Sequence, residues 1–167
     1  MIVWINGAFG AGKSTVTDEL RKRRPELRLF DPEYVGFMLR HFMDVPTGDF
    51  QDLPLWRRLV VETARGLVKL GPLVVPMTLL VPAYRTEIFD GLRSRGVTLH
   101  HVVLRVSEST LRARIDGDVE LADAREWRHS HVPRALSALS GLAGAIEVAN
   151  EGRDAAATAD EIAARMA

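Results

Sequence analysis

The 167-residue sequence contains no cysteine, and its charges cancel, since 22 Lys and Arg residues are balanced by 22 Asp and Glu residues. Without cysteine the chain has no disulfide framework, thiolate metal site or thiol nucleophile, which fits a reducing compartment. A formal net charge of zero argues against a nucleic-acid binder that relies on overall positive charge. We therefore expect a cytoplasmic protein without a nucleic-acid partner.

Long hydrophobic runs are also missing. The longest uncharged stretch, residues 70–84, contains three prolines and is shorter than the roughly 20 residues that cross a bilayer. The first residues lack the basic lead and extended apolar core of a signal peptide. What is present is an ordinary globular mixture, 47% hydrophobic and 26% charged. Length and composition therefore predict a single domain over residues 1–167 with no transmembrane segment.

Short apolar runs alternate with longer amphipathic stretches, which is typical of a parallel sheet wrapped by crossover helices. We predict strands at residues 2–6, 28–30, 73–76, 98–105 and 145–149. We predict helices at residues 14–24, 32–43, 54–70, 82–95, 108–115 and 155–166. The acidic, weakly periodic residues 116–124 interrupt this alternation, and we interpret them as a mobile segment within a lid. The sequence thus predicts an α/β fold.

A glycine-rich motif lies between the first predicted strand and the first predicted helix. Its residues, which match the P-loop pattern G-x-x-x-x-G-K-[ST], are Gly7, Ala8, Phe9, Gly10, Ala11, Gly12, Lys13 and Ser14. Glycines let the backbone fold around phosphate oxygens, while Lys13 reaches the β- and γ-phosphates and the Ser14 hydroxyl binds Mg²⁺. We predict that this loop, with Thr15 beside it, binds ATP and Mg²⁺. The alternative, a chance glycine-rich turn, need not supply the Lys-Ser pair or both flanking elements.

A carboxylate that could complete the Mg²⁺ site is missing from its usual place. P-loop proteins often carry one at the end of another strand, but residues 73–78 contain none, which argues against a standard ATPase or GTPase. The nearest substitute is Asp31, at the end of the second predicted strand. There it can accept a proton from an acceptor hydroxyl or bind the metal. Asp31 also precedes Pro32, a common arrangement for a helix N-cap, and the two roles are compatible.

Residues 32–70 are too apolar to be only a loop, and we predict that they form a helical insertion that binds the acceptor. An aromatic pocket with a few polar anchors suits a nucleoside or another amphiphilic ligand. The predicted acceptor contacts are Asp31, Phe37, Arg40, Phe50, Trp56 and Thr78. For each aromatic residue, packing of the insertion against the sheet is the alternative.

Arginines accumulate late in the chain, and we interpret residues 112–134 as a lid. Arg125 and Arg128 have the i,i+3 spacing of one helical face, and we predict that both stabilise the transferring phosphoryl group. Arg112 is a predicted nucleotide contact. Because only three of the 22 basic residues are lysine, arginine is also this protein's ordinary surface cation.

The histidines do not predict a metal site. His100 and His101 are neighbours in a predicted strand, so their side chains lie on opposite faces of the sheet. His129 and His131 have no carboxylate or cysteine that would complete a site, and we interpret them as surface residues of a helix.

Several segments beyond the P-loop carry a family resemblance. They are Trp4-Ile5-Asn6-Gly7-Ala8-Phe9-Gly10, Asp31-Pro32-Glu33, Gly36-Phe37, Leu39-Arg40, Asp49-Phe50-Gln51, Pro54-Leu55-Trp56-Arg57, Val75-Pro76-Met77-Thr78 and His100-His101. The chain resembles the bacterial tunicamycin-resistance proteins, ATP-binding members of the nucleotide-kinase-like P-loop group. The resemblance implies a nucleoside-monophosphate-kinase-like P-loop NTPase fold, with a five-stranded parallel sheet ordered 2-3-1-4-5 and helices on both faces. Relatives can carry an amphipathic C-terminal stretch linked to membrane association, and this sequence shows none.

The resemblance also implies ATP binding and protection against tunicamycin, a uridine-containing, lipid-linked nucleoside. Two classes of function fit. As an enzyme, the protein transfers the γ-phosphoryl group of ATP to a hydroxyl of tunicamycin or a related nucleoside. As a binding protein, it uses ATP only to order a pocket that sequesters the drug. Asp31 and an arginine-rich lid favour the enzyme, because sequestration requires neither. The accepting hydroxyl, the natural substrate and the oligomeric state stay open.

Overall fold

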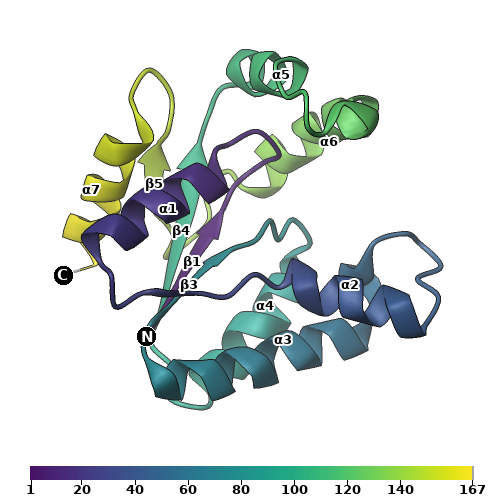
Figure 1. The fold of residues 1–167 in the computed structure, drawn as a ribbon, viewed down its shortest axis with the longest axis vertical. Helices are drawn as coiled ribbons and strands as arrows, with labels where there is room; N and C mark the ends of the chain where they lie inside the picture. The colour runs from purple at the N-terminus through teal and green to yellow at the C-terminus, as the bar shows by residue number, and fades with distance from the viewer. Residues whose placement is uncertain (167) are drawn as a thin grey trace.

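A parallel sheet organises the computed structural model, which describes residues 1–166 (Figure 1). Its strands are β1 (Ile2–Asn6), β2 (Arg28–Leu29), β3 (Leu73–Pro76), β4 (Leu99–Arg105) and β5 (Ile146–Ala149). Their order is β2-β3-β1-β4-β5, and every pairing is parallel. The predicted fold class and strand order are confirmed.

Seven α-helices connect or follow the strands in the described part of the chain. They are α1 (Lys13–Arg23), α2 (Glu33–Phe42), α3 (Pro54–Leu67), α4 (Pro82–Arg93), α5 (Glu108–Asp116), α6 (Arg125–Ala138) and α7 (Ala155–Arg165). Short 3₁₀ turns lie at Phe50–Asp52, Val68–Leu70 and Ala122–Ala124. Both α3 and α4 begin with proline, which is tolerated in a first helical turn because its missing N–H would have no intrahelical partner.

Strand β1 separates two hydrophobic cores, because consecutive side chains of a strand point to opposite faces of the sheet. Val3 and Ile5 pack in one core with residues of α1 and α7. Ile2 and Trp4 pack in the other with residues of α3 and α4. All five residues of β1 are buried, as expected for the central strand of a sheet covered on both sides.

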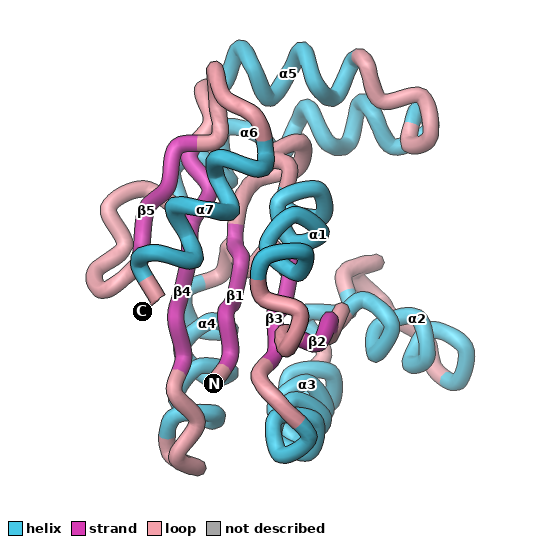
Figure 2. Tube along the Cα trace, turned by 60° about the vertical axis from the view of Figure 1, so that its left-hand side comes forward, coloured by secondary structure: helices cyan, strands magenta, loops and turns pink. Residues whose placement is uncertain are grey.

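The carboxyl ends of the strands open between two projecting parts of the molecule. Helices α5 and α6 lie beyond these ends, and α2 extends away from the sheet edge on the other side (Figures 1 and 2). This arrangement separates residues 112–134, the predicted lid, from residues 32–70, the predicted acceptor-binding insertion. The loop after β1 lies at the base between them.

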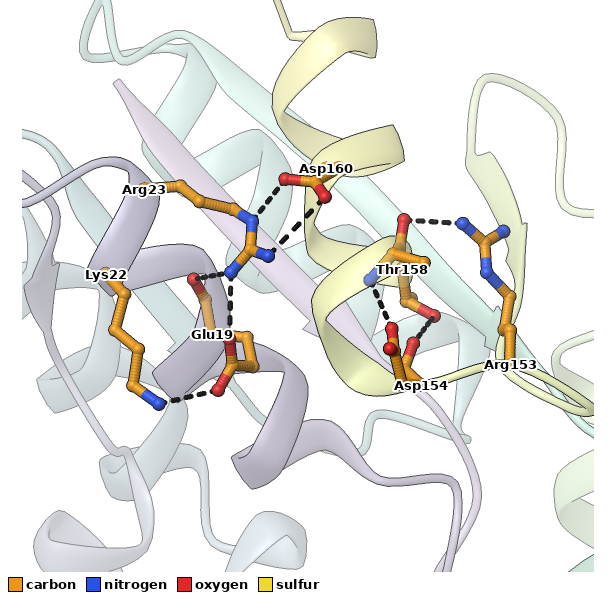
Figure 3. A network of polar contacts seen from close by, with 8 residues as sticks. Glu19, Lys22, Arg23, Arg153, Asp154, Thr158 and Asp160 are labelled. Carbon is orange, nitrogen blue, oxygen red and sulfur yellow. Dashed lines mark hydrogen bonds and ion pairs between the residues drawn. The ribbon is translucent and has the colours of Figure 1, made fainter.

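Helix α1 is fastened to α7 by an ion-pair network (Figure 3). The Arg23 guanidinium contacts Asp160 of α7 and donates to Glu19 Oε2 of its own helix at 2.8 Å. Asp154 caps α7, with its side chain accepting from the Ala157 N–H at 2.7 Å. The helix that begins at the P-loop is thereby held by the last described helix.

Candidate active site

The P-loop turns sharply between β1 and α1. Gly10 and Gly12 have φ angles of 82° and 86°, in the left-handed region that side chains disfavour. A Cβ atom on Gly12 would also lie 2.7 Å from Asn150 Nδ2. Glycine is therefore required at residue 12 by both its backbone conformation and its close neighbour.

Lys13 begins α1, and its ammonium curls back over the loop. Its Nζ donates to the carbonyl oxygens of Gly7 and Ala8, each at 3.1 Å. Burial lowers the pKa of Lys13 to about 8; Glu33 opposes this shift, and Arg128 adds to it. Lys13, Glu33 of α2 and Arg128 of α6 all line the same cavity.

A cavity of about 570 Å³, the phosphate cavity, lies above the P-loop and is bounded by α2 and the lid. It brings together most of the predicted phosphate and catalytic residues and a further predicted acceptor contact, Thr78. Those that line it are Phe9, Gly10, Gly12, Lys13, Ser14, Thr15, Asp31, Thr78 and Arg128. Ser14 and Thr15 are exposed, so their hydroxyls are accessible to a ligand.

The other P-loop residues support the loop from beneath. Gly7, Ala8 and Ala11 are buried or partly buried and do not line the phosphate cavity. The Thr78 hydroxyl donates to the Gly7 carbonyl at 2.8 Å, so the end of β3 fixes the start of the loop. On the other side, Asn150 Nδ2 donates to the Ala11 carbonyl at 2.7 Å.

Asp31 has the position predicted for it, at the cavity wall after β2. Its Oδ1 accepts from the Glu33 N–H at 2.9 Å, so the capping role is present. Its Oδ2 makes no hydrogen bond to residues 1–166 and is available to a ligand. The structure therefore shows the capping role of Asp31, and its role as proton acceptor or metal ligand stays a prediction.

Glu33 is a second carboxylate at the same wall, and it was not predicted from the sequence as a site residue. Burial and the neighbouring Asp31 raise the pKa of Glu33, whereas Lys13 lowers it. The available signal was its place in Asp31-Pro32-Glu33, because the first turn of a helix places both carboxylates near the strand ends. A hydroxyl and two carboxylates are ligands that Mg²⁺ accepts, so Ser14, Asp31 and Glu33 fit this ion.

The lid arginines differ from one another. Arg128 is 6% exposed, lines the cavity and donates to Asp118 Oδ2 at 2.8 Å, while its buried Nε has no partner within residues 1–166. Arg112 is engaged by Glu108 of its own helix and approaches His129. Neither Arg112 nor Arg125 lines the cavity. The structure therefore brings only Arg128 of the three predicted arginines to the site.

The predicted aromatic contacts of the insertion lie outside the phosphate cavity. Trp56 is 0% exposed, and its indole N–H donates to the Pro32 carbonyl at 3.1 Å. Phe50 is buried against Trp56, with ring centroids 5.4 Å apart. The prediction that Trp56 contacts the acceptor is wrong for this structure, because α3 turns this residue into the core. Phe37 is half exposed, and the Arg40 guanidinium lies over Phe50 and donates to the Gly48 carbonyl.

The aromatic side chains that do line the phosphate cavity are Phe9 and Trp127. Their ring centroids are 4.9 Å apart in an edge-to-face arrangement, and Trp127 is 51% exposed. Arg114 lines the cavity as well, donating to the carbonyls of Gly10 (3.3 Å) and Asn150 (2.8 Å). Neither Trp127 nor Arg114 was predicted from the sequence as a site residue. No sequence pattern singled out Trp127, whereas Arg114 lies among the arginines of residues 112–134.

The fold and the P-loop together define a P-loop protein of the kinase-like class. Residues 2–136 match a family model described as an AAA domain, and the chain belongs to this family. The structure is similar to the tunicamycin resistance protein of Deinococcus radiodurans, with a TM-score of 0.76 and 27% identity over 99% of this chain and 94% of that one. The resemblance stated from the sequence motifs is confirmed.

More distant structures share the fold. An adenosine phosphosulfate (APS) kinase of Mycobacterium tuberculosis, solved with AMPPNP and APS, has a TM-score of 0.73 and 19% identity over 99% of this chain and 96% of that one. A gluconokinase of Sinorhizobium meliloti has a TM-score of 0.61 and 18% identity over 98% and 94% of the two chains. A search of curated protein sequences gives no match. Within residues 1–166, no helix is long and apolar enough to span a membrane.

Proposed function

We propose that this protein is an ATP-dependent phosphotransferase that moves the γ-phosphoryl group of ATP to a hydroxyl of tunicamycin or a related nucleoside. The observation that carries the proposal is the set of residues that line the phosphate cavity. Lys13, two carboxylates and the buried Arg128 surround the space above the P-loop. Nucleotide binding alone requires the loop and its lysine, but not a carboxylate pair facing them.

In the proposed reaction, the acceptor hydroxyl oxygen forms a bond to the γ-phosphorus. The bond from that phosphorus to the β,γ-bridging oxygen breaks, ADP leaves, and the hydroxyl proton passes to Asp31 or Glu33. Lys13 and Arg128 stabilise the charge on the phosphoryl oxygens. Ser14 and Asp31 would hold Mg²⁺, which neutralises phosphate charge when it is bound.

The surface beside Asp31 supports an amphiphilic acceptor. Helix α2 and the residue after it expose large apolar side chains, since Tyr34 is 72% and Phe42 is 79% exposed. Phe37, Met38 and Met43 are also exposed. An apolar groove of about 420 Å³ also includes Asp31 and runs along Leu29, Tyr34 and Met38. A nucleoside hydroxyl at Asp31 would leave an attached apolar chain next to this groove.

Product analysis tests the proposal. Purified protein is incubated with tunicamycin and Mg-ATP, and the drug is examined by mass spectrometry while ADP is measured. We expect the drug to gain the mass of one phosphoryl group, in step with ADP formation, and Lys13→Ala to abolish both. Unmodified drug that binds tightly only with ATP present would favour sequestration and overturn the transfer proposal.

A further inference from the structure

A second polar pocket lies between α4 and β4, and it shares no lining residue with the phosphate cavity. Its volume is about 260 Å³, and it is enclosed by α4, by His101 of β4 and by residues 142–144 before β5. We call it the α4–β4 pocket. Basic side chains dominate it, since Arg85, Arg93 and His101 face a single carboxylate, that of Asp90.

The protonation of His101 follows from its neighbour Asn6. Asn6 Oδ1 accepts from the N–H groups of Gly7 (2.9 Å) and Leu79 (3.0 Å), which fixes the orientation of its amide. Asn6 Nδ2 therefore faces His101 Nε2, 3.4 Å away, as a donor. His101 Nε2 must be the acceptor, so Nδ1 carries the proton.

The Nδ1–H of His101 is thus a hydrogen-bond donor without a protein partner among residues 1–166. His101 is only 6% exposed, yet it lines the α4–β4 pocket. Nδ1 is not among the buried polar atoms that lack a partner, so it is open to the pocket and not sealed within the protein. The pocket therefore presents an accessible hydrogen-bond donor to a ligand.

The charges of the pocket favour an anion. Arg85 has no carboxylate partner in the described part of the chain, and its Nη1 donates only to the Leu79 carbonyl at 3.3 Å. Arg93 lies 3.6 Å from Asp90, so the two arginines keep an excess of one positive charge. Burial lowers the pKa of His101 to about 4, and both arginines add to the shift. An anion would relieve this crowding of positive charge.

We propose that the α4–β4 pocket binds a small tetrahedral oxyanion, namely phosphate or the phosphate group of a phosphorylated metabolite. The guanidinium groups of Arg85 and Arg93 donate to its oxygens, and His101 Nδ1–H donates from the floor of the pocket. The Thr86 side chain at the rim supplies a further polar group. Donors of this kind match phosphate oxygens, which accept several charge-assisted hydrogen bonds.

This site is separate from the phosphate cavity but shares a support with it. The Leu79 carbonyl accepts from both Arg85 Nη1 and Asn6 Nδ2, and Asn6 in turn binds the first P-loop residue. Phosphate that binds at the P-loop could therefore also perturb His101, through the hydrogen bonds of Asn6. The experiment must distinguish the two origins.

Side-chain NMR of the whole protein makes this distinction. Inorganic phosphate is titrated at constant ionic strength, and the His101 imidazole resonances are assigned with His101→Gln. We expect a saturable shift of these resonances. It should persist in Lys13→Ala, which weakens phosphate binding at the P-loop, and its apparent affinity should fall about tenfold or more in Arg93→Gln and in Arg85→Gln.

Arg95→Gln is the matched control, because Arg95 follows α4 but does not line the pocket. It should leave the phosphate response unchanged. A His101 signal that does not respond, that responds equally to chloride, or that loses its response in Lys13→Ala would overturn the proposal. A response that survives both Arg85→Gln and Arg93→Gln would overturn it as well. Thermal unfolding of each variant establishes that the protein is folded.

Discussion

Arg128 and Asp118 form an ion pair at the wall of the phosphate cavity, with Nη1 2.8 Å from Oδ2. The arginine is almost fully buried, whereas the aspartate side chain is 28% exposed. One end of the guanidinium is thereby fixed by the residues that join α5 to α6, while its buried Nε lacks a partner within residues 1–166. We infer that Asp118 positions Arg128 for phosphate.

Asp118→Asn should lower kcat with little change in the KM for ATP, because the amide keeps the shape but weakens the charge-assisted bond that orients Arg128. Arg128→Ala should lower turnover more, on the order of 10³-fold, the lower end for a phosphate-stabilising arginine. Steady-state kinetics on folded variants measures both effects. Asp123→Asn, in the same segment, is the control. Equal kcat values for Asp118→Asn and wild type would contradict the positioning role of Asp118.

Lys13→Ala should greatly weaken ATP binding and leave the fold intact, because it removes the ammonium that the loop holds beside the phosphate site. Titration calorimetry with a non-hydrolysable Mg-ATP analogue measures the affinity. Lys22→Ala is a matched control on the same helix, since Lys22 is exposed and paired with Glu19. Wild-type affinity in folded Lys13→Ala would contradict the phosphate assignment.

Asp31→Asn should reduce phosphoryl transfer strongly while nucleotide affinity changes much less. The amide retains an oxygen that can accept from the Glu33 N–H, but it cannot take up the acceptor proton. Glu33→Gln tests the second carboxylate in the same way, with the exposed Asp44→Asn as control. Single-turnover rates and their Mg²⁺ dependence are the measurements. If both variants kept wild-type rates, the carboxylates would be structural only.

Trp127 should report ligand binding by fluorescence, because Trp4 and Trp56 are 0% exposed and Trp127 lines the cavity. We expect nucleotide or acceptor to shift or quench the emission in the wild type, and Trp127→Phe to abolish the change. Trp56→Phe should keep the change while lowering stability, since Trp56 packs in the core. A fluorescence change that depended on Trp56 instead would indicate that the acceptor binds in the insertion.

His101 should make folding sensitive to acid. Its pKa of about 4 lies below the ordinary 6.5, so the neutral imidazole contributes stability that is complete above pH 6.5 and is lost as the pH falls toward 4. The loss should reach about 3 kcal/mol. Urea unfolding between pH 7 and 4 measures it, and His101→Gln should flatten the curve relative to His100→Gln. Identical slopes for the two variants would contradict the assignment.

Features encoded in short sequence motifs were easier to predict than features that depend on packing between distant segments. The P-loop and Asp31 were predictable because their signals lie in a few consecutive residues beside clear strands. The strand order came from the family resemblance. Helix α6 received no predicted bounds, because Pro133 lies inside it and its apolar residues do not follow one face.

The acceptor contacts were harder to predict, since an aromatic residue on an amphipathic helix suits a core as well as a pocket. Trp56 and Phe50 proved to be core residues, whereas Trp127 reaches the cavity from a segment without clear periodicity. The lid arginines illustrate the same difficulty. Arg112 is paired with Glu108 on its own helix, a contact that sequence spacing allows but does not require.

The contacts between α1 and α7 affect when the nucleotide site can form during synthesis. The Arg23–Asp160 pair and the bond from Asn150 to the Ala11 carbonyl join residues 137 and 139 positions apart. During synthesis the P-loop therefore emerges well before the groups that brace it. Contacts of such long separation form slowly because a large loop must close first. A nascent chain should therefore gain its full nucleotide affinity only after these contacts have formed.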